Sequence, residues 1–205
     1  MAELLSCVAD RVLERRARGL VERLVPHLPL RGALLDVGCG TGHNAEALRR
    51  RTGLRVVEAD VTDMKTRGEP PLLFDGKALP LPSGSFDAAL LAFVVHYADE
   101  PRALLAEVAR VARSVLLLQS THEGGLSLGA LRLRELLQGR LPHGVARALG
   151  YAGGEPRALL PRRFYGRLEL DALVASAGLR VTGRDEGERS PLALRRELLA
   201  LEAAL

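Results

Sequence analysis

The chain has 205 residues, of which 47% are hydrophobic, and its formal net charge is +4 at pH 7. A chain of this length can bury one sizeable core, and because no long linker interrupts it we expect a single domain over residues 1–205. No apolar run approaches the roughly 20 residues that cross a bilayer, and charged residues interrupt the first turns, so we expect no membrane span and a cytoplasmic location. Cys7 and Cys39 are too few for a disulfide framework or a structural zinc site, and no metal is expected.

The first 25 residues place leucine and valine at helical spacing, with charges between them and prolines after them. We therefore expect an N-terminal helical segment within 1–30. Next, Ala33–Val37 is a short apolar run that ends in a cluster of glycines, and residues 44–51 have a helical pattern. This order predicts a strand, a tight turn and a helix.

The same unit recurs along the chain. Strands are expected at 54–59, 86–93, 114–119 and 179–182, and helices at 101–112, 168–177 and 193–205. Apolar strands that alternate with amphipathic helices predict an α/β fold: a Rossmann-like, doubly wound, mainly parallel sheet of six to seven strands with helices on both faces. Asp99 is expected to cap the helix that follows it, and Gly178 to end the helix before the last strand.

The glycine turn carries the main functional signal. Gly38, Gly40 and Gly42 follow a buried strand and open a helix, where bare backbone lets a nucleotide-like ligand approach. A nicotinamide or flavin site uses G-x-G-x-x-G and holds a pyrophosphate there, but this chain has G-x-G-x-G with Asp36 just before it. A carboxylate at that place repels a diphosphate and attracts an ammonium or sulfonium. S-adenosylmethionine (SAM) has both cations and no phosphate, so the pattern favours SAM over a dinucleotide.

Four motifs, in this order and spacing, resemble those of class I SAM-dependent methyltransferases, and specifically the type 11 group with its ubiquinone/menaquinone C-methyltransferase relatives. The motifs lie at 34–42, 56–60, 75–82 and 85–93. The resemblance runs from about Leu34 to Arg113, with a looser match over 167–185. It implies a SAM-dependent methyltransferase that releases S-adenosylhomocysteine (SAH).

The resemblance also implies a set of cofactor-binding residues: Asp36, Gly38, Cys39, Gly40, Asp60, Val61, Asp75, Gly76 and Ala92. In this set Asp36 would face the ammonium of the methionine part, and Ala92 would offer it a carbonyl. Asp60 would accept hydrogen bonds from both ribose hydroxyls. Asp75 would bind the adenine amino group, and the Gly76 amide a ring nitrogen. Cys39 is expected to be an apolar wall of the pocket and not a nucleophile.

The chain departs from the family pattern in three places. Glu58 stands where the family usually has a small residue, so it competes with Asp60 for the ribose role. Arg113 and Ser114 replace the usual Pro-Gly-Gly before the fifth strand. The antiparallel seventh strand is not evident, because Pro191 leads into a leucine-rich helical pattern.

The reaction requires mainly that two reactants be positioned and desolvated, so a catalytic base is optional. Both cysteines lie before position 40, which disfavours cytosine C5 methylation, and 93–97 lacks the Asn/Asp-Pro-Pro-Tyr/Phe motif of base amino methylation. His96 is the candidate base, because it follows the fourth strand and an imidazole titrates near neutral pH. A histidine that lines the pocket or satisfies a backbone group is the alternative. Tyr97, His122 and Tyr165 are weaker candidates.

The N-terminal helical segment and residues 122–167 remain after the core is assigned. We expect 122–167 to form a helical lid over the acceptor site. Its apolar face would contain Leu126, Leu128, Leu131, Leu133, Leu136 and Leu137. It also carries eight arginines, at 132, 134, 140, 147, 157, 162, 163 and 167, which either favour an anionic acceptor or are solvated surface residues.

The sequence thus predicts methyl transfer to a small organic acceptor, which would be anionic if the arginines face it and not solvent. Three other functions stay open: a SAM-binding sensor without catalysis, a nicotinamide oxidoreductase, and an RNA-directed methyltransferase that uses the arginine-rich segment. Nucleic acid is the less favoured partner, because aromatic residues, which stack on bases, make up only 3% of the chain.

Overall fold

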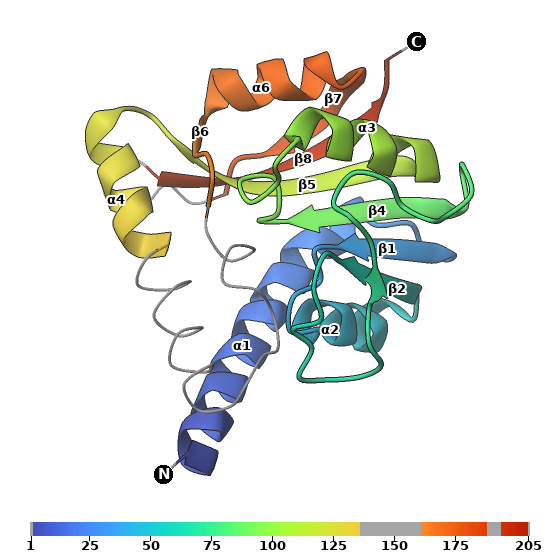
Figure 1. The fold of residues 1–205 in the computed structure, drawn as a ribbon, viewed down its shortest axis with the longest axis vertical. Helices are drawn as coiled ribbons and strands as arrows, with labels where there is room; N and C mark the ends of the chain where they lie inside the picture. The colour runs from blue at the N-terminus through green and yellow to red at the C-terminus, as the bar shows by residue number, and fades with distance from the viewer. Residues whose placement is uncertain (1, 136–160, 188–193, 205) are drawn as a thin grey trace.

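A single mixed sheet lies between two layers of helices in the computed structural model, which describes residues 2–135, 161–187 and 194–204 (Figure 1). The helices are α1 (Ala2–Leu24), the 3₁₀ turn η1 (Val25–His27), α2 (His43–Thr52), α3 (Pro101–Val111), α4 (Gly125–Glu135) and α6 (Arg167–Ser176). The strands are β1 (Ala33–Val37), β2 (Arg55–Asp60), β3 (Leu72–Leu73), β4 (Phe86–Ala92), β5 (Ala112–His122), β6 (Tyr165–Gly166), β7 (Leu179–Asp185) and β8 (Leu194–Ala203).

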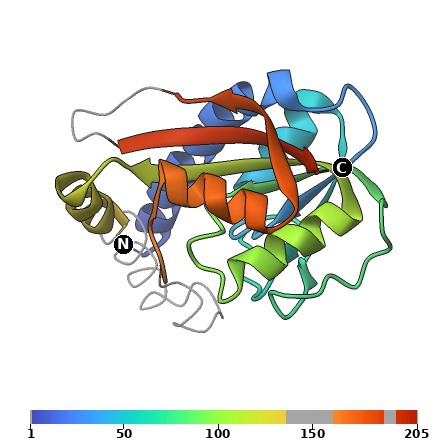
Figure 2. The ribbon, with the colours of Figure 1, turned by 90° about the horizontal axis from the view of Figure 1, so that it is seen from above.

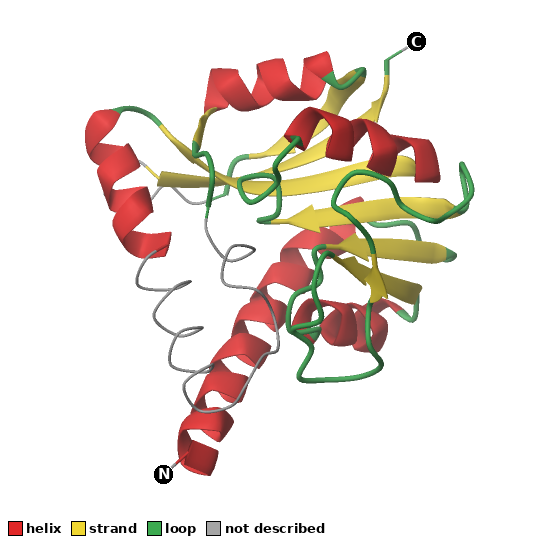
Figure 3. Ribbon diagram, viewed as in Figure 1, coloured by secondary structure: helices red, strands yellow, loops and turns green. Residues whose placement is uncertain are grey.

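The order of the strands places the glycine turn at the centre of the sheet. That order is β3-β2-β1-β4-β5-β8-β7, with β6 paired to β5. Figure 3 shows the strands in yellow and the helices in red. The strands from β3 to β5 are parallel, and the chain leaves β1 for β2 on one side while β4 adds on the other. In open α/β sheets ligands bind outside the carboxyl ends of the strands at such a reversal of strand order. The predicted α/β, doubly wound fold is confirmed. The described residues form eight strands where six to seven were expected, and two of the eight are only two residues long.

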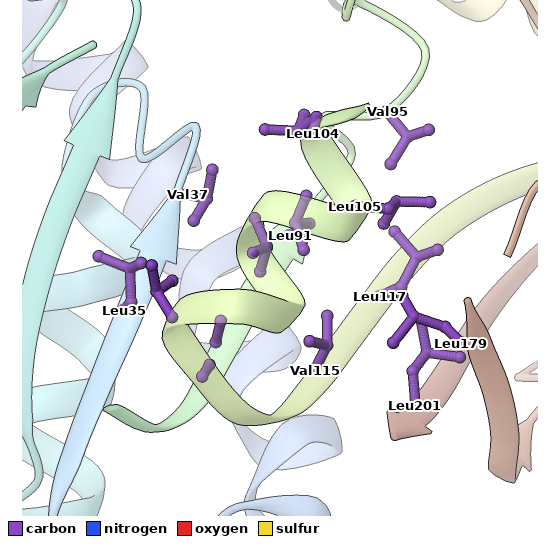
Figure 4. Close-up of a cluster of buried hydrophobic side chains, with 14 of the residues drawn as sticks. Leu35, Val37, Leu91, Val95, Leu104, Leu105, Val115, Leu117, Leu179 and Leu201 are labelled. Carbon is purple, nitrogen blue, oxygen red and sulfur yellow. The ribbon is translucent and has the colours of Figure 1, made fainter. Parts of the chain in front are cut away.

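Each face of the sheet has its own apolar core, which explains why all five residues of β1 are buried. On one face, α1 and α2 cover a cluster of Val21, Leu24, Leu34, Ala45, Leu48, Leu54, Val56, Ala88, Leu90, Leu116, Leu118 and Leu198. On the other, α3 and α6 lie side by side over the sheet (Figure 2). Figure 4 shows this second core, in which Leu104 and Leu105 of α3 pack toward Leu91 and Leu117. The two cores hold the strand ends rigidly at one edge.

The helix predicted at 193–205 is wrong, because Leu194–Ala203 forms strand β8. β8 runs antiparallel to both neighbours, β5 and β7, so the antiparallel strand that the sequence did not reveal is present. Its leucines, alanines, glutamate and arginines favour helix locally. Pairing on both edges and burial of Leu198, Leu199 and Leu201 override that preference.

The predicted cap at Asp99 is also wrong. Helix α3 begins after Glu100, and no side chain caps it. The Asp99 carboxylate instead pairs with Arg162 at 2.5 Å. Gly178, in contrast, does follow α6 with a positive φ of 74°, as a residue that ends a helix is expected to do.

No helix in the described part of the chain is long and apolar enough to cross a membrane. The longest, α1, packs through its second half on α2, where Val21 and Leu24 are buried. In its first half Val8 is 53% exposed.

The pairing of β8 can be tested by truncating Leu199, which is fully buried and opposite Leu117. Leu199→Ala should lower the free energy of unfolding by about 3 kcal/mol, because it leaves a cavity in the core. Glu202→Ala, at an exposed position of the same strand, should change it by less than about 0.5 kcal/mol. Urea denaturation measures both, and equal small effects would contradict a central β8.

Candidate cofactor site

The glycine turn after β1 is folded tightly over the end of β2 and is open on one side. The Gly38 amide donates to the Ala59 carbonyl at 2.7 Å. Gly38 has a φ of +73°, and a Cβ placed on it would lie 2.5 Å from Val94 Cγ2, so a side chain does not fit. Gly40 also has a positive φ, of +55°, but nothing lies within 4 Å of a Cβ built there. The backbone at Gly40 is therefore accessible to a ligand.

Asp60 joins this turn to the end of β2. Its Oδ2 accepts from the Gly40 amide at 2.8 Å, and its Oδ1 accepts from the Val61 amide at 2.7 Å. Burial raises the pKa of Asp60, while these backbone donors act in the opposite direction. The sequence analysis predicts that Asp60 binds the ribose hydroxyls. In the structure the Asp60 carboxylate lies beside the accessible backbone of Gly40.

Asp36 is the most unusual group at this edge. The residue is 1% exposed, and among the described residues Oδ2 has no hydrogen-bond partner. Burial, and then the charges of Glu58 and Asp60, raise the pKa of Asp36 to about 7. A buried acceptor without a donor is uncommon in a folded protein and marks either strain or the place of a missing ligand. A positively charged ligand group would satisfy this oxygen and stabilise its ionised form.

The loop after β3 forms a second wall of the same region. The Phe74 amide donates to the Asp60 carbonyl at 3.1 Å, which brings Asp75 and Gly76 to the end of β2. A Cβ on Gly76, whose φ is +81°, would lie 3.3 Å from Val61 Cγ1, and Val61 is 49% exposed. An exposed apolar side chain beside a bare backbone suits the flat face of an adenine. The Asp75 carboxylate accepts from the Lys77 and Ala78 amides, which lower its pKa.

Cys39 lies within the turn and is buried. Burial, followed by the charge of Asp36, raises the pKa of its thiol far above neutral pH. A thiol that stays protonated is a poor nucleophile, which agrees with the expectation that Cys39 is not one. Its place as an apolar wall of the pocket stays a prediction.

The end of β4 lies on the other side of the turn. Val37 is paired with Leu91, so Ala92 lies beside Gly38, and Phe93 follows it with a positive φ of 62°. This conformation is rare for a residue with a side chain, and it turns the chain away from the sheet. The carbonyl of Ala92 is thus brought to the same edge as the Asp36 carboxylate.

His96, the candidate base, is buried. Its side chain is 2% exposed, its Nδ1 accepts from the Gln119 amide at 2.9 Å, and its ring lies 4.0 Å from that of Tyr97. Its carbonyl accepts from the Arg162 amide at 2.7 Å. In this arrangement a neutral imidazole carries its proton on Nε2. To accept a proton through Nε2, the Gln119 amide would have to turn so that its oxygen accepts from Nδ1.

The structure also reveals polar groups that sequence reasoning missed around the turn. Glu58 Oε2 accepts from Lys65 Nζ and from Arg49 Nη2, each at 2.7 Å. Glu58 was expected to compete with Asp60 for a ribose, but Asp60 is the one that contacts Gly40. Strand alternation places Glu58 and Asp60 on one face, whereas the two cations come from other elements that no local pattern connects to it.

A second missed network ties α1 to the turn. His43, which opens α2 and is 5% exposed, lies 2.9 Å from Thr41 Oγ1 through Nδ1 and 2.8 Å from Asp10 Oδ1 through Nε2. Arg67 from the loop after β2 pairs with Asp10 as well and with Glu46 at 2.7 Å. The N-terminal helix therefore supports the cofactor side of the sheet.

The arginine-rich segment is described only in part. Arg162, Arg163 and Arg167 pair with Asp99, Glu169 and Glu186 at 2.5, 3.6 and 2.6 Å. The side chains of the other five arginines, and Leu136 and Leu137, lie outside the described residues. In α4, Leu131 is 1% exposed and Leu133 is 56% exposed, so the apolar face expected there is divided. These three arginines give no support to an anionic acceptor.

Comparison with known proteins finds a methyltransferase domain in the part of the chain that contains this turn. The sequence model of a methyltransferase domain matches residues 35–115. An uncharacterized protein of Mycobacterium bovis is 31% identical over 150 residues, which is 73% of this chain and 47% of that protein. A demethylmenaquinone methyltransferase of Renibacterium salmoninarum is 36% identical over 106 residues, 48% of this chain and 44% of that protein. The chain thus spans about half the length of these curated relatives.

Among solved structures, a geranyl diphosphate methyltransferase in complex with SAM has a TM-score of 0.62 and 13% identity, over 99% of this chain and 90% of that one. This likeness shows the shared fold. The residues of the site fit SAM as well, because the buried Oδ2 of Asp36 requires a donor and the backbone at Gly40 is accessible. Residues 35–115, with the motifs at the carboxyl ends of the strands, thus match the methyltransferase domain of the class I, type 11 group of SAM-dependent methyltransferases.

Proposed function

We propose that the chain binds SAM and transfers its methyl group to a small organic acceptor. The observation that carries this proposal is the carboxylate of Asp36, buried beside a bare backbone turn with one oxygen unpartnered. Such a group favours a nucleoside with a positive charge and disfavours a diphosphate. The match to a methyltransferase domain, and the solved methyltransferase of the same fold that contains SAM, support this proposal.

Each wall of the site would hold one part of the cofactor. Asp36 and the carbonyl of Ala92 would bind the ammonium. Gly38, Cys39 and Gly40 would lie against the methionine part, and Asp60 would bind the ribose. Val61, Asp75 and Gly76 would hold the adenine. When bound, SAM supplies a methyl group on a sulfonium; the residues of the chain position it and exclude water.

The acceptor would approach from the ends of β4 and β5, where His96 and the first part of the segment 122–167 lie. The segment 122–167 would form a helical lid over the acceptor, and α4 is its described helix. His96 is the proposed base, and Gln119 is the residue that fixes the orientation of its ring. An RNA acceptor is less favoured, because the three described arginines of the segment are paired with carboxylates.

A binding and turnover experiment tests the function as a whole. Calorimetric titration should show binding of SAM and SAH and none of NAD or NADP. Incubation with SAM and a panel of small phenols, quinols, carboxylates and terpenoid diphosphates should then release SAH with at least one acceptor. Binding of SAM without SAH release from any acceptor, including RNA, would favour a sensor and contradict the proposed enzyme.

The ionisation of Asp36 predicts a pH dependence of binding. Because its pKa is raised to about 7 in the folded chain, Asp36 is largely neutral at about pH 6 and attracts an ammonium only weakly. SAH should therefore bind about fivefold more tightly at about pH 7.5 than at about pH 6. Asp36→Asn should bind SAH weakly at both pH values. A wild-type affinity for SAH that falls as the pH rises would contradict the assignment of Asp36 to the ligand ammonium.

The raised pKa of Asp36 also predicts that its ionised form, which favours binding, lowers the stability of the fold. A folded-state pKa raised from 3.8 to about 7 means that the folded chain holds a proton that the unfolded chain releases. The contribution of Asp36 to stability is thus lost as the pH rises from about 4 to about 7, and is constant above that. In the absence of cofactor, Asp36→Asn should melt at a higher temperature than the wild type at about pH 8. A lower melting temperature would mean that the ionised carboxylate is compensated within the protein.

For catalysis, His96→Ala should lower kcat by about a hundredfold or more with the identified acceptor, while the affinity for SAH stays within about twofold. His27→Ala, at an exposed histidine, serves as the matched control and should change neither. Turnover of the His96 variant at the wild-type rate would remove His96 from the chemistry and leave it as a buried structural residue.

A further inference from the structure

A second carboxylate lies beside Asp36, on the neighbouring strand. Asp36 and Glu58 are register partners in the parallel pair of β1 and β2, so their side chains project from the same face of the sheet. Glu58 is 7% exposed, and its Oε1 has no hydrogen-bond partner in the part of the chain that the structure describes. Asp36 Oδ2 and Glu58 Oε1 are therefore two buried carboxylate oxygens without described donors, on residues that face each other across neighbouring strands.

The other oxygen of Glu58 fixes the direction of this carboxylate. Oε2 accepts from Lys65 Nζ and Arg49 Nη2, each at 2.7 Å, and the side chains of Glu58 and Lys65 are only 5% and 4% exposed. A Cβ placed on Gly42 would lie 3.3 Å from Oε1. Because both cations bind one oxygen, the second oxygen is directed toward the glycine turn.

The charges around Asp36 favour the approach of a further cation. Glu58 exerts the largest charge effect on Asp36 and raises the pKa of that carboxyl, whereas Arg49 and Lys65 lower it to a smaller extent. Two like charges in a region of low dielectric disfavour each other unless a cation lies near both. A ligand ammonium that enters beside Asp36 would interact favourably with Glu58 as well.

We propose that Glu58 is a second acidic residue of the cofactor-binding site and acts with Asp36 to select a nucleoside that carries an ammonium group. This inference rests on the proposed function and deepens it. Glu58 adds attraction for the amino-acid part of the ligand and none for its adenine and ribose, which are assigned to the end of β2 and the loop after β3. Its role is in specificity, so it is visible as a difference between two ligands.

The test compares SAH with 5′-methylthioadenosine, which has the same thioether nucleoside but lacks the amino-acid ammonium and carboxylate. Glu58→Gln retains the size of the side chain and an oxygen that accepts from Lys65 and Arg49. By calorimetry, the variant should bind SAH about tenfold more weakly and methylthioadenosine within about twofold of the wild type. Glu58→Asp, which restores the charge, should recover part of the preference for SAH.

Two further variants separate this effect from a general loss of structure. Glu197→Gln alters another buried glutamate, which pairs with Arg184 on the far side of the sheet, and should leave both affinities unchanged. Lys65→Met removes a cation that compensates Glu58, so it should shift the ratio of affinities the opposite way, toward SAH. This variant keeps the inference testable even if Glu58→Gln does not fold.

Equal weakening of both ligands by Glu58→Gln, or no loss of SAH affinity, would overturn the role of Glu58 and leave the proposed function intact. A shift of the Lys65→Met ratio away from SAH would also overturn it. Failure of the wild-type chain to bind SAH at all would instead overturn the proposed function, and this inference with it.

Discussion

A buried carboxylate with one oxygen left without a donor is the constraint on which the site depends. Asp36 is held at the end of β1 with both faces of the strand covered, and within the described part of the chain no group donates to its Oδ2. The fold can keep this group only because the two apolar cores and the sheet pairing outweigh its desolvation. The free energy stored in this way becomes available to a ligand that brings a positive charge.

The fold directs that charge to one place. The reversal of strand order between β2 and β4 brings the turn, the Asp60 carboxylate and the Ala92 carbonyl to one edge. Glycines at 38 and 40 keep the backbone bare on that edge, and Val61 and Gly76 close it on the side of β3. The hydrogen bonds among Asp10, His43 and Thr41 then connect the N-terminal helix to the turn, so the rigidity of the cofactor side does not depend on the sheet alone.

How much of this could be predicted depended on whether the cause was local. The glycine turn, the acid before it and the acid at the end of β2 lie close in sequence to the strands that position them, so the order of strand, turn and helix around them was predicted correctly. Their roles toward a cofactor stay a prediction. The strand β8 was mistaken for a helix because its pairing with β5 and β7 is not local and its composition favours helix. The compensation of Glu58 by Lys65 and Arg49 was missed for the same reason, since three separate elements supply these groups. Asp99 was assigned to a helix cap from local spacing, whereas an arginine 63 positions later in the printed sequence takes it as a partner.

A crystal structure of the chain with SAH bound would test the central claim most directly. The account predicts that the ligand ammonium lies within about 3 Å of Asp36 Oδ2, on the open side of Gly40, with the ribose hydroxyls on Asp60. An SAH molecule whose ammonium lies away from Asp36, with that oxygen still lacking a donor, would contradict it.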